Sequence, residues 1–174
     1  MALLTISAIH FIFLIVLVNG NSNNVGVQLV IISSLVFLIV GYMHAPRSKS
    51  DHSKIGTIVH PFALASAGVL TFYLSIHLKW GPVIASAAVG FVTSYLSVFK
   101  SSFLKSLPVP IYCGSFVGMC GSVLTEDYFF VAYAGLISGI IFLITRNYFV
   151  GVGGKLGTIA FGGVVIVSFI YSLL

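Results

Sequence analysis

Acidic residues are scarce in this sequence, which has three Asp and Glu residues against eight Lys and Arg residues. The three acids, Asp51, Glu126 and Asp127, all lie outside the long apolar runs. Carriers that couple to protons or sodium usually bury carboxylates inside membrane helices, so this scarcity argues against active cation pumping. The sequence also lacks an evident nucleophile, carboxylate pair or metal cluster, and we therefore expect a protein that is not an enzyme.

Cysteine and histidine are too few, and too widely spaced, to indicate a metal site. Cys113 and Cys120 are the only cysteines, and a helix would separate them by about 10 Å, which is beyond disulfide reach. None of the five histidines is three or four residues from another on one predicted helix, as a helical metal site requires. We expect neither a metal nor a cofactor.

Apolar residues dominate instead. Hydrophobic residues make up 59% of the chain, charged residues 6%, and the mean hydropathy is +1.15. These values are typical of a membrane protein, and they predict a single membrane domain over residues 1–174. The basic residues are scattered singly between apolar runs and do not form a patch, so nucleic acid is not an expected partner.

The apolar runs predict an all-α, polytopic bundle of about seven transmembrane helices. A lipid-exposed backbone must satisfy its own hydrogen bonds, and the runs are too uniformly apolar for the alternating strands of a barrel. The predicted spans are Ala2–Val18, Val25–His44, Gly56–His77, Pro82–Phe99, Leu107–Leu124, Phe129–Thr145 and Leu156–Leu174.

The basic residues predict the orientation, because they collect in alternate loops on the cytoplasmic side. Seven of the eight fall in the second, fourth and sixth loops: Arg47, Lys49, Lys54, Lys100, Lys105, Arg146 and Lys155. The exception is Lys79 in the third loop. We expect a cytoplasmic N-terminus, an external C-terminus and, as the compartment, a bacterial inner membrane.

The span 107–124 is the least regular of the seven. It contains Pro108 and Pro110 and three glycines, so it could be broken or re-entrant instead of crossing fully. A failure to cross would invert the later half and place Glu126 on the same side as Lys100. The charge alternation therefore favours a full crossing.

A short internal match suggests a repeat. The segment 54–58 reads KIGTI and the segment 155–159 reads KLGTI, and the span before each is also similar. If the match is real, spans one to three (residues 1–78) correspond to spans five to seven (residues 103–174), with the helix 82–99 as linker. Two parallel three-helix units of this kind occur in transporters.

Polar residues within the spans are candidates for a solute pathway. His60 can bind a proton or a polar solute, and Pro61 frees the carbonyl of Thr57 four residues earlier. The remaining candidates are Ser66, Tyr112, Cys113, Ser115 and Ser138. Ordinary packing between helices is the alternative for all seven. Pairs of small residues four apart, namely Ala63/Ala67, Ser86/Gly90, Gly114/Gly118 and Gly135/Gly139, predict closely approaching helices.

The glycine-rich segment 151–158 lacks the spacing of a nucleotide-binding P-loop, because Phe149 and Leu156 occupy two required positions. A weaker possibility remains, in which helix-end amides and a lysine hold an anion or a lipid phosphate. The residues concerned are Lys54, Gly153, Gly154 and Lys155. A plain turn with a basic anchor is the alternative.

Two functions are compatible with these features. The first is a transporter or channel for a small neutral or anionic solute, formed within the chain or in a homo-oligomer. The second is a non-catalytic membrane subunit, anchor or sensor that acts through a partner membrane protein or through the lipid bilayer.

Overall fold

The computed structural model describes residues 2–20, 26, 28–29, 54–120, 127–148 and 153–173. These residues form helices joined by turns, and there is no strand among them. They fall into two compact units. One contains α1 (Ala2–Gly20) and residues 145–148, and the other contains residues 54–144 and 153–173.

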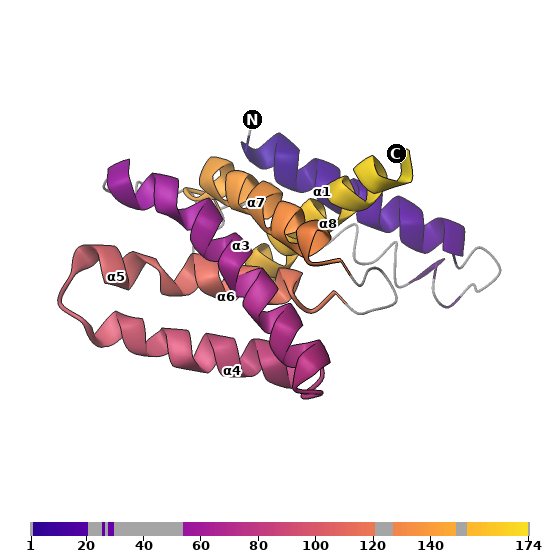
Figure 1. The fold of residues 1–174 in the computed structure, drawn as a ribbon. Helices are drawn as coiled ribbons and strands as arrows, with labels where there is room; N and C mark the ends of the chain where they lie inside the picture. Colours follow the sequence, from indigo (N-terminus) through magenta and orange to yellow (C-terminus); the bar gives the residue numbers. More distant parts are fainter. Residues whose placement is uncertain are drawn as a thin grey trace. The chain divides into compact units, whose positions relative to one another are not determined.

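The larger unit contains the remaining helices (Figure 1). These are α3 (Lys54–His77), α4 (Pro82–Ser94), the 3-10 helix η1 (Tyr95–Val98), α5 (Ser102–Ser106), α6 (Pro108–Val117), α7 (Tyr128–Thr145) and α8 (Lys155–Leu173). Within the described residues, three helices are long and apolar enough to cross a membrane: Ile58–His77, Tyr128–Thr145 and Lys155–Leu173. The prediction of an all-helical fold is confirmed for the described residues, and these three helices are compatible with a membrane protein.

Seven spans and the internal repeat stay predictions. The span Val25–His44 lies outside the described residues except for Gly26, Gln28 and Leu29, and residues 121–126 also lie outside them. The predicted span 82–99 corresponds to α4 followed by η1, which begins where α4 ends. Together they extend about 28 Å, close to the thickness of the hydrocarbon core.

The predicted span 107–124 contains a short helix preceded by a break. Helix α6 has ten residues and extends about 15 Å, half of the hydrocarbon thickness. Pro108 and Pro110 have no N–H groups, so they cannot bond the carbonyls of Leu104 and Ser106 as a continuous helix would require. The Leu107 amide donates to the Leu104 carbonyl at 3.3 Å instead, and α5 and α6 are separate helices.

Glycines set the packing of α6 and α7 against α3. A Cβ at Gly114 of α6 would collide with the Leu64 carbonyl oxygen. A Cβ at Gly118, the residue after α6, would collide with the Gly68 carbonyl oxygen. On α7, a Cβ at Gly135 would lie 2.6 Å from the Ala65 Cα. The backbones therefore approach closely because the side chains are missing, as the four-residue spacing of these glycines predicts.

The same contacts give the helix directions. Gly135 faces Ala65 and Gly139 faces Pro61, so α7 runs antiparallel to α3. Gly114 faces Leu64 and Gly118 faces Gly68, so α6 runs parallel to α3. Ser86 of α4 contacts Ser115 of α6, and Gly90 of α4 contacts Tyr112 of α6. Helix α4 is therefore antiparallel to α6. Helix α8 is antiparallel to α7, because Phe130 contacts Tyr171 and Ser138 contacts Ala160. Consecutive long helices of the larger unit thus alternate in direction, with α6 counted as one of them.

Replacing Gly114 by alanine tests the close approach of α6 and α3. The added Cβ must displace backbone, so we expect Gly114→Ala to lower the free energy of unfolding by about 1–3 kcal/mol. Unfolding of the purified protein in mixed detergent micelles, followed by circular dichroism, measures this change. The matched control is Gly157→Ala in α8, where no described atom lies within 4 Å of an added Cβ. Equal effects of the two variants would contradict the packing.

Candidate functional site

His60 lies in the second turn of α3 and connects it to the α5–α6 break. The residue is 3% exposed, and Nε2 lies 3.3 Å from Ser106 Oγ. Ser106 directs its own hydroxyl proton to the Phe103 carbonyl at 2.7 Å. The His60 Nε2–H is therefore the donor in this pair, since a hydroxyl has only one proton. The ring also makes an edge contact with Phe142 of α7, with a centroid distance of 5.8 Å.

A pair of serines joins α4 to α6 in the protein interior. Ser86 and Ser115 are 4% and 0% exposed, and their Oγ atoms are 2.9 Å apart. Ser115 donates to the Tyr112 carbonyl at 2.8 Å, so Ser86 is the donor to Ser115. The Ser86 proton thus joins α4 to α6, whereas the Ser115 proton is bonded within α6.

Two further polar side chains bind α8. Cys113 on α6 donates to the Leu156 carbonyl at 3.3 Å, and Ser138 on α7 lies 3.5 Å from the Ala160 carbonyl. Both side chains are fully buried. The Ser138 contact is at the limit of hydrogen-bond length and contributes little energy, but it lies where Gly163 allows α8 to approach α7.

The other predicted pathway residues lie at the surface or on packing faces. Tyr112 is 42% exposed, covers Gly90 of α4 and contacts Phe116 with a ring centroid distance of 4.7 Å. Pro61 is half-buried against Gly139. Ser66 is exposed and donates to the Ala63 carbonyl of its own helix at 3.0 Å. The seven residues are therefore spread over several helix contacts.

The predicted anion contact lies at the start of α8. Gly153 and Gly154 are exposed, and Gly154 has a φ of 85°, a conformation that favours glycine. The amide and the hydroxyl of Thr158 both donate to the Gly154 carbonyl, whereas Lys155 is half-buried. The side chain of Lys54 lies outside the described part of the chain.

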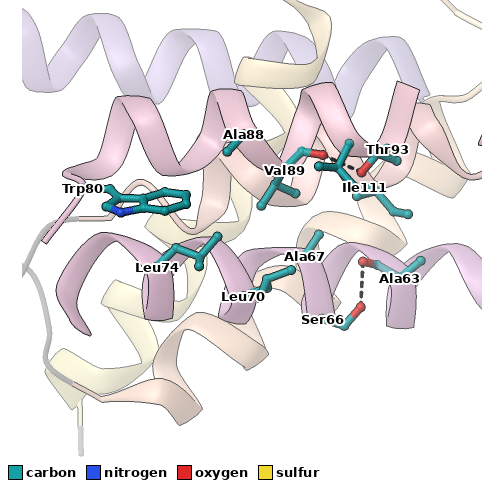
Figure 2. Close-up of a pocket in the computed structure, with 11 residues that line it drawn as sticks. Ala63, Ser66, Ala67, Leu70, Leu74, Trp80, Ala88, Val89, Thr93 and Ile111 are labelled. Carbon is teal, nitrogen blue, oxygen red and sulfur yellow. Dashed lines mark hydrogen bonds between the residues drawn. The ribbon is translucent and has the colours of Figure 1, made fainter. Parts of the chain in front are cut away.

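An apolar groove lies between α3 and α4 (Figure 2). It has a volume of about 610 Å³, within the range of about 300–1,000 Å³ typical of small-ligand sites. Its wall is formed by Ala63, Ser66, Ala67, Leu70 and Leu74 of α3, Ala88, Val89, Val92 and Thr93 of α4, Ile111 of α6 and Trp80 of the connecting turn. Of the predicted pathway residues, Ser66 is the one in this wall.

The polar atoms of the groove wall are largely engaged within their own helices. Thr93 Oγ1 donates to the Val89 carbonyl at 2.6 Å, and Ser66 Oγ donates to the Ala63 carbonyl at 3.0 Å. The sequence does not predict the groove, although Ala63 and Ala67 form one of its small-residue pairs. Ala67 also faces Gly114 of α6, while both alanines border open space toward α4.

Comparisons with known proteins add no identification. No protein family model, curated protein or solved structure matches this chain.

The Ser86–Ser115 pair gives a direct test of the α4–α6 contact. In a double-mutant cycle of Ser86→Ala, Ser115→Ala and the double variant, we expect a coupling energy of about 0.6 kcal/mol, the average for hydrogen bonds between membrane helices. Unfolding free energies in mixed micelles give the four corners of the cycle. Ser94→Ala is the control, because Ser94 is exposed and bonds the Phe91 carbonyl of its own helix. If the changes in unfolding free energy of Ser86→Ala and Ser115→Ala are additive, the pair is contradicted.

Proposed function

We propose that this protein is a membrane transporter or channel for a small neutral or anionic solute, without coupling through a membrane-embedded carboxylate. The observation that carries this proposal is α6, a half-length helix that begins after a proline-induced break and packs against α3, α4 and α8. Interrupted helices are tolerated at membrane depth where they are buried in protein or line a cavity, and transporters use them at solute sites.

The charges near the start of α6 favour a neutral or anionic solute. Lys105 lies in α5, three residues before α6, and Lys100 precedes α5. The N-terminal end of a helix carries a partial positive charge, which adds to that of the lysines. Pro108 and Pro110 remove two of the amides that would hold an anion at this end. We therefore propose that a solute contacts His60 Nε2 and Ser106 Oγ beside the break, in place of the hydrogen bond between them.

The finer architecture is part of the proposal. We propose seven spans, a cytoplasmic N-terminus, an external C-terminus, a bacterial inner membrane and an assembly that can include a homo-oligomer. The repeat proposal is supported by direction: α7 is antiparallel to α3, and Phe130 of α7 contacts Tyr171 of α8 while Ser138 contacts Ala160. Helices α3 and α8, which the repeat treats as equivalent, therefore run the same way.

A second function is favoured by a different observation. The buried hydroxyls and thiol of Ser115, Cys113 and Ser138 lie within hydrogen-bond distance of backbone carbonyls, and the groove between α3 and α4 is apolar. These features suit a non-catalytic membrane subunit or anchor that binds a membrane protein or lipid. Specific co-purification of a membrane protein, combined with the absence of solute flux, would favour this alternative.

Solute flux into liposomes tests the transport proposal. The purified protein is reconstituted and scanned with small anions and neutral solutes. We expect His60→Ala to change the flux by roughly tenfold, equivalent to about 1.4 kcal/mol in the barrier. His60→Gln retains a donor toward Ser106, so its flux should lie closer to that of the wild type.

Three further variants extend this measurement. Ser115→Leu should abolish flux if the interior side of α6 lines the route, while Ser115→Ala shows whether the side chain can be changed without unfolding. Ser94→Leu alters an exposed serine and should leave flux unchanged. The absence of flux for every solute, with the wild type folded and inserted, would contradict the proposal.

A further inference from the structure

We propose that the groove between α3 and α4 binds one acyl chain of an anionic phospholipid, with the lipid phosphate at Lys79. This site is distinct from the α5–α6 break and does not depend on the proposed transport function. The proposal is based on the lining, the length and the end residues of the groove.

The groove lining suits a hydrocarbon chain. Leu70, Leu74, Val89 and Val92 supply branched apolar side chains, whereas alanines on both helices leave the space between them open. Figure 2 shows the two rows facing each other, with Trp80 at one end. Because Thr93 and Ser66 already donate to backbone carbonyls, the wall offers an apolar ligand contact without leaving hydroxyl protons unpaired.

The length of the groove matches one leaflet of a bilayer. Its residues on α3 extend from Ala63 to Leu74, which corresponds to about 16 Å along the helix axis. Half of the hydrocarbon thickness is about 15 Å. An acyl chain lying in the groove would therefore run from the membrane surface to the midplane.

The Trp80 end of the groove has the features of a membrane interface. The membrane-spanning part of α3 ends at His77, and Trp80, 46% exposed, lies three residues later. Tryptophan concentrates at the level of lipid headgroups. The preceding residue, Lys79, is exposed and has a φ of 54°, in the left-handed region that non-glycine residues seldom adopt.

Charge complementarity selects an anionic headgroup. Lys79 is the basic residue of the turn between α3 and α4, and a lysine at the membrane surface attracts anionic lipid. Asp127, which is at the start of α7, accepts hydrogen bonds from the Phe129 amide and the Tyr171 hydroxyl. Lys79 directly precedes Trp80, which lines the groove, so the proposal pairs this lysine with the phosphate once the acyl chain occupies the groove.

Trp80 supplies the measurement, because it is the only tryptophan in the chain. The full-length protein is reconstituted in phosphatidylcholine vesicles that contain a minor fraction of phospholipid brominated near the glycerol end of its acyl chains. Bromine quenches Trp80 fluorescence on contact. We expect brominated phosphatidylglycerol to bind roughly fivefold more tightly than brominated phosphatidylcholine, the effect of one lysine at the surface.

Matched variants separate the groove from general contact with lipid. Ala88→Leu fills the groove and should abolish the preference for phosphatidylglycerol, whereas Ala87→Leu changes an exposed neighbour that does not line it and should retain it. Lys79→Gln should make the two lipids bind equally tightly, whereas Lys105→Gln, in α5, should leave the preference for phosphatidylglycerol unchanged. Lys79 is exposed, so its variant tests the proposal even if Ala88→Leu does not fold.

Three results would overturn the proposal. The first is equal quenching of the wild type by the two lipids. The second is an unchanged preference in both Ala88→Leu and Lys79→Gln. The third is quenching by either lipid that falls as the protein-to-lipid ratio rises, which would show that a second copy of the chain covers the groove.

Discussion

The close approach of glycine backbones to α3 is the constraint on which the larger unit depends. Two helices meet α3 at backbone distance, α6 through Gly114 and α7 through Gly135. Association of helices in lipid gains little from the hydrophobic effect, so dispersion contacts at short range must supply the energy. A methyl group at either glycine would separate helices whose other contacts require the short distance.

This constraint also explains the placement of the polar groups. When backbones approach closely, small hydroxyl and thiol side chains reach the carbonyls of the neighbouring helix, as Cys113 does with Leu156. Such bonds satisfy groups that would be costly to leave unpaired in hydrocarbon. The same residue types that would line a polar pathway therefore also serve as contacts between helices, and their identity alone does not separate the two roles.

The sequence predicted the long helices well and their partners poorly. The predicted span 129–145 differs by one residue from α7, because Asp127 and Arg146 interrupt the apolar run near its two ends. Pro108 and Pro110 predicted an irregular span 107–124, but the short helix α5 before it fell in a predicted loop. The end of α6 at Val117 was not predicted either, since the following residues are as apolar as the helix. The groove could not be predicted, because Ala63 and Ala67 form the same small-residue pattern whether a neighbouring helix contacts them or leaves them open.

Ile111 belongs to α6 and also lines the groove between α3 and α4. One side chain thus connects the interrupted helix with the apolar surface. A displacement of α6 along α3 would carry Ile111 with it and change the depth of the groove beside Val89 and Thr93. If a lipid chain fills the groove as proposed, the free energy of filling it depends on the position of α6, so the lipid concentration would act on this helix as a ligand concentration does.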